Sequence, residues 1–171
     1  MACVLTQGFT LDCKDKVGGL KAIYVVEFDA LSSYTLASGE ITALSLDGAK
    51  VFFKYELPKG VSSMTWTVQT NPDNGTTFYE SAIVIKLRGL STAKRNELKL
   101  LSSAQLLLIA RDNNDVYWLH GFETGVDVTA ATGGTGTAMG DAYGMDLTFT
   151  HREMDLPALV QSGVVTSLSL S

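Results

Sequence analysis

Apolar and polar side chains alternate along residues 61–70, which read VSSMTWTVQT, and this period of two is typical of a half-buried strand. The apolar face holds Met64, Trp66 and Val68, and the opposite face holds the uncharged polar side chains Thr65, Thr67 and Gln69. The turn residues NPDNG follow, and TTFYESAIVIKLR then reads as a second strand. The pattern predicts a long β-hairpin over residues 61–88.

The second strand of this hairpin changes its apolar side near Ala82. Phe78, Ala82 and Val84 share a face near the turn, whereas Ile83, Ile85 and Leu87 lie on the opposite face further along. One interpretation is a β-bulge, which flips every later side chain, or a strand buried on both faces. The other is that the half near the turn meets a neighbouring subunit while the distal half packs in its own core.

The rest of the chain predicts short strands and one helix. Strands are expected at residues 20–28, 41–46, 49–57, 104–110, 116–120, 125–128 and 145–151. Asp47-Gly48 is expected to turn a hairpin, and residues 30–40 are expected to form a Ser-rich loop. Ser91 is the expected N-cap of a helix over residues 92–103. The predicted fold class is mainly β, a β-sandwich or partly closed barrel with a long hairpin and one α-helix.

Length and charge narrow the function classes. The 171 residues suit a single domain, 1–171, with a core of its own. A formal net charge of -5 argues against a surface that binds nucleic acid by neutralising phosphates. The first residues show no secretory signal, and no apolar run has the length of a membrane helix. We therefore expect the protein to be made and used in the cytosol, without a membrane partner. In that compartment Cys3 and Cys13 are expected to be reduced thiols.

No segment of the sequence carries a strong signature of a catalytic, phosphate-binding or metal-binding site. The Gly-rich segment 132–144 misses the spacing of nucleotide-binding loops, so a shaped loop is expected instead of a phosphate site. His120 and His151 are the only imidazoles, and His151 with Glu153 is expected at a solvated strand edge, not in an acid–base or metal site. We therefore predict no catalytic residue, no cofactor and no metal.

The sequence predicts that the N-terminal and C-terminal segments are arms of the single β domain. Residues 157–171 carry no charged side chain, and such a segment would be a β-aggregation hazard if it were left exposed. We expect it to dock either on its own sheet or on the edge of a neighbouring subunit. Residues 1–17 are expected to form the N-terminal arm.

The order of these parts resembles a known family. A strand pair opens into the hairpin KVFFKYELPKGVSSMTWTVQTNPDNGTTFYESAIVIKL, the helix segment GLSTAKRNELKLL follows, and TGTAMGDAYGMDLTFTHRE leads into the uncharged tail. This arrangement resembles the tail tube proteins of long-tailed bacteriophages and the related tubes of contractile injection systems. The start, LDCKDKVGGLKAIYVVE, is similar to structural proteins of phages that infect Bacteroidetes.

The resemblance implies a structural role and no enzymatic activity. It implies hexameric rings that stack into a hollow tube, held in the virion tail with other tail or virion proteins, assembled in the host bacterial cytoplasm and crossed by double-stranded DNA without specific binding. The implied interface and lumen residues are Thr65, Thr67, Gln69, Thr77, Tyr79 and Ser81, with the large ring of Tyr79 a departure from a smooth conduit. The implied inter-subunit arm residues are Leu159, Val160, Val164 and Val165.

Three alternatives stay open. A capsid decoration or head-to-tail connector protein would share the β-sandwich and the docked tail. A carbohydrate-binding β-sandwich module would use exposed aromatic rings such as Trp66, Tyr79 or Trp118. An enzyme that uses His151 and Glu153 is the remaining reading, and the sequence favours it least.

Overall fold

The computed structural model describes residues 7–11 and 13–168, and its fold is mainly β. Its elements are β1 Leu20–Glu27, a 3-10 helix Phe28–Ala30, β2 Leu31–Ala37, β3 Glu40–Leu46, β4 Phe53–Glu56, β5 Ser63–Asn71, β6 Thr76–Arg88, α1 Thr92–Leu101, β7 Leu106–Asp112, β8 Tyr117–His120, β9 Asp127–Gly134, β10 Gly144–Glu153, β11 Ala158–Val160 and α2 Ser162–Ser167. None of the helices in this part of the chain is long and apolar enough to cross a membrane.

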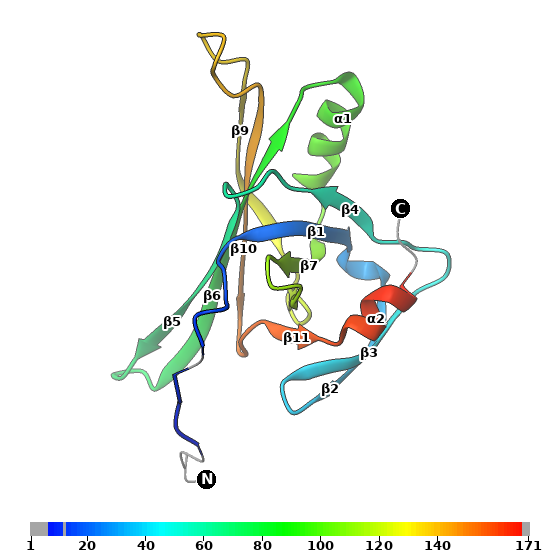
Figure 1. Cartoon of the computed structure of the whole chain (residues 1–171). Coiled ribbons are helices and arrows are strands. Elements are labelled where there is room, and N and C mark those ends of the chain that lie inside the picture. The colour runs from blue at the N-terminus through cyan, green and yellow to red at the C-terminus, as the bar shows by residue number, and fades with distance from the viewer. Residues whose placement is uncertain (1–6, 12, 169–171) are drawn as a thin grey trace.

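Two sheets build the molecule (Figure 1). A seven-stranded sheet has the order β2-β3-β11-β8-β7-β1-β4, and a four-stranded sheet has the order β5-β6-β10-β9. The four-stranded sheet is long and runs along one side of the molecule, while the seven-stranded sheet curls beside it without closing into a barrel. This confirms the prediction of a mainly β, sandwich-like fold.

The first core fills the space between the two sheets. Its fully buried members include Ile83 and Ile85 from β6, Leu147 and Phe149 from β10, and Leu108 from β7. These residues recur at every second position of their strands, so one face of each strand enters the core. The four-stranded sheet is held to the rest of the molecule through this single face.

The second core lies on the other face of the seven-stranded sheet. Tyr24 and Val26 of β1 point into it, whereas Ile23 and Val25 of the same strand point into the core between the sheets. A strand that is buried on both faces reads as a continuous apolar run, which explains the sequence AIYVV in β1. The seven-stranded sheet therefore has its central strands covered on both sides.

Helix α1 covers one end of the space between the sheets (Figure 1). The Ser91 hydroxyl accepts a hydrogen bond from the backbone N–H of Lys94 at 3.3 Å, which is the N-cap contact expected from the sequence. Leu98 and Leu101 lie three residues apart and pack against the core between the sheets. The predicted helix and its cap are confirmed.

The predicted hairpin around Asp47-Gly48 is wrong. β3 pairs with β2 in a hairpin that turns at Ser38 and Gly39, both with positive φ, and β4 pairs with β1. Residues 31–37 belong to the Ser-rich segment that the sequence predicts as a loop, and most of them are exposed in the structure. Pairing with β3 makes them a strand, an effect of tertiary context that local composition does not report.

The C-terminal segment docks on its own subunit. β11 lies between β3, with which it pairs in parallel, and β8, with which it pairs antiparallel. Val160, Val164 and Val165 are buried in the second core, and Leu159 is half-buried. The alternative that these residues form an inter-subunit arm is therefore wrong for residues 157–168; the last residues, 169–171, lie outside the described residues.

Helix α2 is a second α-helix that the sequence did not predict. Its residues SGVVTS are β-branched or small, which favours strand or loop in isolation. The burial of Val164 and Val165 against the second core compensates for this weak propensity, since most helix stability in proteins comes from packing.

Residues 7–11 and 13–17 form an exposed N-terminal segment with a turn at Lys14 and Asp15. Phe9 and Leu11 project fully into solvent. Its junction with the fold is fixed by Asn114, whose side chain bonds both the N–H and the carbonyl of Val17 at 3.0 and 2.9 Å. Cys13 in this segment is an exposed free thiol, and Cys3 lies outside the described residues.

Candidate assembly surface

The strand β6 keeps one register along its whole length. It pairs with β5 from Ser63↔Val84 to Asn71↔Thr76 and with β10 from Gly144↔Arg88 to Glu153↔Tyr79, without a shift in either ladder. Of the interpretations of the change of apolar side near Ala82, the β-bulge is therefore wrong. The inner face holds Tyr79, Ser81, Ile83, Ile85 and Leu87 throughout, and Ala82 and Val84 are half-buried on the outer face.

The six predicted lumen residues divide between the two faces of the sheet. Thr65, Thr67 and Gln69 lie on the outer face, opposite Ala82, Glu80 and Phe78. Thr77, Tyr79 and Ser81 lie on the inner face, and Ser81 is completely buried. Their assignment to one common face is wrong, because the register across the turn pairs odd positions of β5 with even positions of β6.

Most side chains on the outer face of the four-stranded sheet are polar, and Phe78, Ala82 and Val84 are apolar exceptions. Threonines from all four strands share it, namely Thr65, Thr67, Thr76, Thr132, Thr148 and Thr150. The charged residues of the face occur in both signs, three of each: Lys86, Arg88 and Arg152 against Glu80, Asp127 and Asp146. Its formal charge is therefore zero.

Two cross-strand ion pairs neutralise much of this charge locally. The Arg152 guanidinium lies 2.9 Å from Glu80, and the Lys86 ammonium lies 3.1 Å from Asp146. Both pairs stand directly opposite each other in the β6–β10 ladder. Sequence reasoning missed them because the register that aligns these residues is not visible in either strand alone.

The inner face of the hairpin extends beyond the core. Met64 packs on the core between the sheets, but Trp66 is 43% and Val68 is 54% exposed toward the tip. Trp66 stacks on Trp118 of β8 with ring centroids 5.3 Å apart. Both rings line a groove of about 410 Å³ together with Leu36 and Leu156. Trp66 and Val68 therefore form an apolar overhang of the hairpin, a surface that its own subunit covers only in part.

The two edges of the four-stranded sheet are open. β5 and β9 are its outermost strands, and neither has a second partner strand among the described residues. β5 carries no charged residue and β9 carries only Asp127. Proteins protect exposed edges with charges, prolines or short strands, and apart from one register shift beside β9 these edges lack such protection. Both are suited to pairing with another chain.

The two hairpins of this sheet project in opposite directions. The β5–β6 turn lies at one end of the molecule and the β9–β10 loop lies at the other (Figure 1). The β9–β10 loop is the Gly-rich segment, and Asp141 accepts hydrogen bonds from the backbone N–H groups of Ala138 and Thr137, which lower the pKa of its carboxyl group. Met139 at its tip is fully exposed. The loop is thus ordered by its own turn and free to contact another subunit.

His120, His151 and Glu153 form a buried cluster under the hairpin. The prediction that His151 and Glu153 lie at a solvated edge is wrong, since they are 5% and 3% exposed and both face the inner side of the sheet. His120 Nδ1 lies 2.9 Å from His151 Nε2, and His151 Nδ1 lies 3.3 Å from Glu153 Oε2. Burial, followed by the charge of His151, lowers the pKa of His120 well below its usual range.

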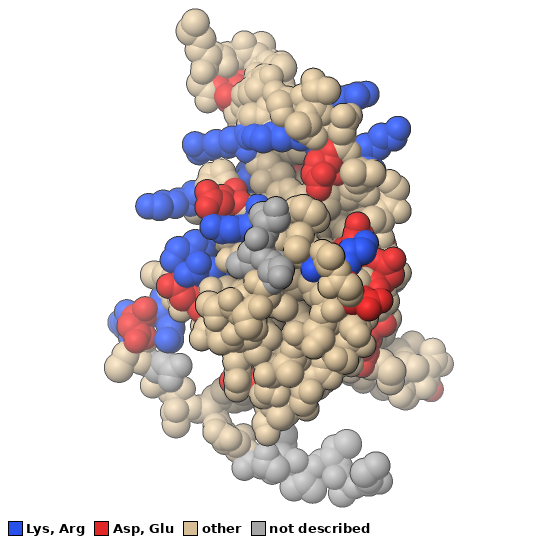
Figure 2. Space-filling model, turned by 90° about the vertical axis from the view of Figure 1, so that its right-hand side faces the viewer, with Lys and Arg blue, Asp and Glu red and all other residues tan. Residues whose placement is uncertain are grey.

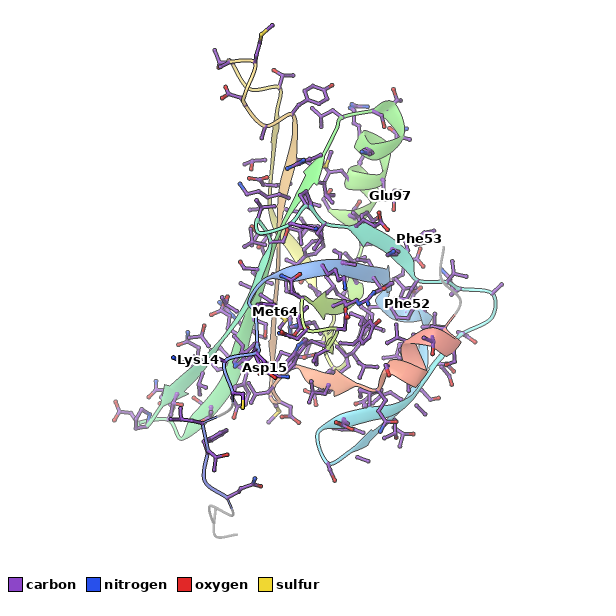
Figure 3. The ribbon with its side chains drawn as sticks, in the orientation of Figure 1. Lys14, Asp15, Phe52, Phe53, Met64 and Glu97 are labelled. Carbon is purple, nitrogen blue, oxygen red and sulfur yellow. The ribbon has the colours of Figure 1, made fainter. Side chains whose placement is uncertain are left out.

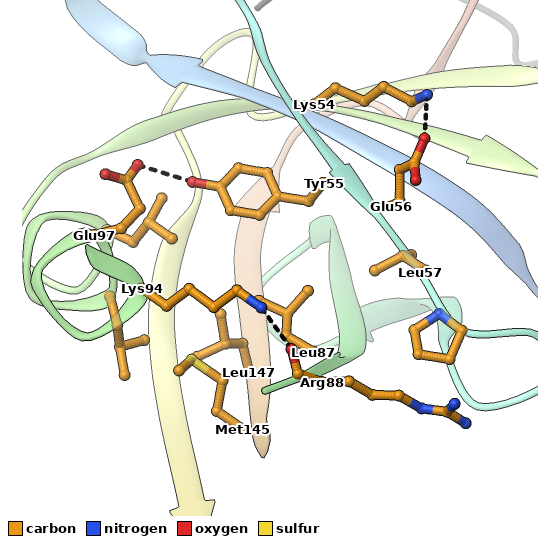
Figure 4. A pocket seen from close by; sticks show the side chains of 13 residues that line it. Lys54, Tyr55, Glu56, Leu57, Leu87, Arg88, Lys94, Glu97, Met145 and Leu147 are labelled. Atoms are coloured by element: carbon orange, nitrogen blue, oxygen red, sulfur yellow. Dashed lines mark hydrogen bonds and ion pairs between the residues drawn. The ribbon is translucent and has the colours of Figure 1, made fainter. Parts of the chain in front are cut away.

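A cavity with both apolar and polar lining residues lies between α1 and β4 (Figure 4). This cavity of about 480 Å³ is lined by apolar side chains such as Leu98 and Met145, and the Tyr55 hydroxyl donates to Glu97 at 2.9 Å. Burial and the Glu97 carboxylate raise the pKa of Tyr55. Lys94 donates to the carbonyl of Arg88 at 2.7 Å, so its ammonium caps the end of β6. These contacts fix the helix against the sheet.

The charged side chains on the face that includes α1 and β4 are of mixed sign (Figure 2). Ion pairs such as Lys54–Glu56 at 2.8 Å account for part of this mixture. Within the described residues, no group of three or more His, Cys, Asp and Glu side chains is arranged to hold a metal ion.

Comparisons with protein-family models, with curated proteins and with solved structures found no match for this chain.

Proposed function

We propose that this chain is a structural subunit of a phage tail tube, which assembles into stacked rings through its four-stranded sheet. The observation that carries the proposal is the pair of open, nearly uncharged edges on a sheet that packs on its own subunit through one face only. An unprotected edge of this kind is a liability in a monomer and a joining device in an assembly. The resemblance of the chain's element order to tail tube proteins supports the same role.

The two edges of the sheet are different strands, β5 and β9, so the way they pair between subunits determines the symmetry of the assembly. Joining β5 of one subunit to β9 of the next is a head-to-tail contact, and such contacts close into a ring when the rotation per subunit allows it. The number six for the ring comes from the family resemblance alone. Repetition of this contact would extend the four-stranded sheet into a continuous inner barrel.

The outer face of the sheet would line the conduit. Thr65, Thr67 and Gln69 keep their proposed lumen role, while Thr77, Tyr79 and Ser81 lose it because they face inward. A threonine-rich wall with balanced charge would not gather phosphates through counterion release, so DNA could pass without salt-dependent adhesion. Because Tyr79 lies on the inner side, its large ring would not project into the conduit.

The projecting parts of the subunit would join successive rings. The β5–β6 turn and the β9–β10 loop reach opposite ends of the molecule, as stacked rings require (Figure 1). The exposed residues 7–11 and 13–17, with Phe9 and Leu11 in solvent, take the arm role that the C-terminal segment does not have. We place the protein in the virion tail, with other tail or virion proteins as partners.

The experiment is negative-stain imaging of the concentrated, purified protein beside its Val68→Lys variant. Val68 lies on the edge strand β5 and is half exposed, so lysine there leaves the subunit folded but places a charge at the joining edge. Rings or tubes are expected for the parent and their loss for the variant. Leu100→Lys is the matched control, because Leu100 is similarly exposed on α1, away from the sheet.

The other outcomes separate the alternatives. Single rings that never stack would indicate a head-to-tail connector, and binding of monomers to preformed capsids would indicate a decoration protein. A strictly monomeric protein at every concentration and salt level would overturn the tube proposal. In that case Trp66→Ala in a glycan-binding assay tests the carbohydrate-binding alternative, since its ring is the exposed member of the Trp66–Trp118 pair.

A further inference from the structure

The turn that joins β5 to β6 contains an asparagine followed by a glycine, Asn74 and Gly75. Residues 71–75 read NPDNG, and all five are exposed. In Figure 3 Met64 of β5 lies near the middle of the molecule, whereas this turn stands at the free end of the hairpin. Asn71, where the turn begins, is about 23 Å further along the strand than Met64. Water therefore reaches both residues of the Asn74–Gly75 pair.

The Asn74 side chain takes no part in holding the turn. The Asn71 side-chain oxygen accepts hydrogen bonds from the backbone N–H groups of Asp73 and Asn74 at 3.0 and 3.3 Å, which orders the turn. The carboxamide of Asn74 itself makes no hydrogen bond within the described residues. Gly75 has a φ of 64° and no side chain that could shield this carboxamide. The Asn74 side chain is therefore free to rotate toward the backbone nitrogen of Gly75.

We propose that Asn74 is a site of spontaneous deamidation, in which Gly75 supplies the nucleophile. The backbone nitrogen of Gly75 attacks Cγ of Asn74, a new C–N bond forms, and the side-chain nitrogen leaves as ammonia with the proton that Gly75 loses. Water then opens the cyclic imide at either of its carbonyl groups, which gives an aspartate or a β-linked aspartate. The sum of the steps is asparagine plus water to aspartate plus ammonia. No oxidant, reductant or cofactor takes part.

Two of the other asparagines are protected by the residue that follows them. Asn71 precedes Pro72, whose nitrogen carries no hydrogen to lose, so the neutral imide cannot form. Asn96 is exposed but lies in α1, where the backbone N–H of Glu97 belongs to the helix and the Glu97 side chain crowds the approach. Neither asparagine meets a free backbone nitrogen.

The remaining two asparagines, Asn113 and Asn114, are held by hydrogen bonds of their side chains. Asn113 Nδ2 donates to the Gly18 carbonyl at 2.7 Å. Asn114 Oδ1 accepts from the Val17 N–H at 3.0 Å, and Asn114 Nδ2 donates to the Val17 carbonyl at 2.9 Å. Both carboxamides are therefore fixed toward the N-terminal segment. Asn74 thus differs from every other asparagine of the chain by combining an unbonded side chain with an unhindered backbone nitrogen.

One hydrogen bond opposes the reaction in the folded turn. The Gly75 N–H donates to the Pro72 carbonyl at 3.3 Å, slightly longer than the usual range for such bonds. The nitrogen must leave this contact before it can attack, so the turn has to open locally. A hydrogen bond of ordinary net strength corresponds to a slowing of between about two- and tenfold relative to the unfolded chain. The turn therefore delays the modification without preventing it.

The modification changes both the charge and the backbone of the hairpin tip. It places a second carboxylate beside Asp73 and makes the formal net charge of -5 more negative by one unit. The β-linked product also adds a methylene group to the main chain between Asn71 and Thr76, which pair next to the turn. Because the turn sets the register of a hairpin, this product disturbs the strand pairing most at the tip. None of these steps requires assembly, so they apply equally to a monomer.

The test is incubation of the purified full chain at mildly alkaline pH, in native buffer and in guanidinium chloride, followed by peptide mapping with mass spectrometry. Asn74 is expected to be the first asparagine modified in the native protein, with aspartate and β-linked aspartate as products. Its rate in native buffer should be lower than in the unfolded chain by up to about tenfold. An Asn74 that stays intact in native buffer while the unfolded chain is fully converted, or earlier modification of another asparagine, would overturn the inference.

Asn74→Gln is the informative variant, because its longer side chain must close a larger ring, which forms more slowly. It should stay unmodified over the time in which the parent is converted. Asn96→Gln is the matched control, since Asn96 is exposed on α1, and this variant should be converted at the parent's rate. Asn74→Asp supplies the charge standard, with which the modified parent should migrate on isoelectric focusing. An Asn74→Gln protein that acquires acidic forms as fast as the parent would also overturn the inference.

Discussion

The two sheets of this protein are buried to very different extents. The central strands of the seven-stranded sheet enter a core on each face, so β1 contributes Ile23 and Val25 to one and Tyr24 and Val26 to the other. The four-stranded sheet enters a core on one face only, and its longest hairpin projects beyond that core. The first sheet holds the subunit together, while the second keeps a polar face, two open edges and an apolar overhang available to other molecules.

The largest difference in stability is expected between alanine variants of two phenylalanines on opposite faces of the four-stranded sheet. Phe149→Ala removes a completely buried ring between the sheets and should cost about 3–5 kcal/mol in the free energy of unfolding. Phe78→Ala removes a ring on the outer face that is 37% exposed, and should cost less than about 1 kcal/mol. Urea denaturation measures both. Equal losses would mean that the outer face is covered within the subunit.

A smaller loss of stability is expected for a substitution in the C-terminal segment, which packs against the second core. Val165→Ala leaves a small cavity beside that core and should reduce the free energy of unfolding by about 2 kcal/mol. Ser162→Ala, an exposed position of the same helix, serves as the control and should change stability little. If instead Val165→Ala affected assembly but not thermal or urea stability, α2 would be an arm for a neighbour and not part of its own core.

The smallest effect is expected for the ion pairs on the outer face. A double-mutant cycle with Glu80→Gln and Arg152→Gln should give a coupling of about 0.5 kcal/mol, because Arg152 is well exposed and such pairs are weak in water. The coupling should fall further in high salt. A coupling of several kcal/mol in the isolated subunit would show that this face is not open to solvent.

Local signals in the sequence predicted the parts of the fold that depend on local chemistry. The NPDNG turn between alternating runs marked the β5–β6 hairpin, and Ser91 before good helix formers marked α1. β2 and α2 were missed, since residues 31–37 form a strand only beside β3, and Val164 and Val165 become helical only against the second core. Both depend on contacts between distant parts of the chain.

The candidate site was predictable only in part for the same reason. The sequence marked the hairpin and its polar face of Thr65, Thr67 and Gln69, but not the partner residues of that face. The register depends on how many residues the turn holds, and the mixed composition of residues 76–82 gives no second clue to it. The histidine cluster was equally hidden, because His120 and His151 come together only when the two sheets pack.

The position of β11 has a consequence for the order in which the chain folds during synthesis. The β2–β3 hairpin joins the seven-stranded sheet only through β11, which pairs with β3 on one side and β8 on the other. Residues 31–46 therefore leave the ribosome long before residues 158–160, a delay on the order of ten seconds at ordinary translation rates. During that interval the second edge of β3 has no partner strand, and its neighbour β2, which exposes Tyr34 and Leu36, gives the nascent hairpin little protection against pairing with other chains.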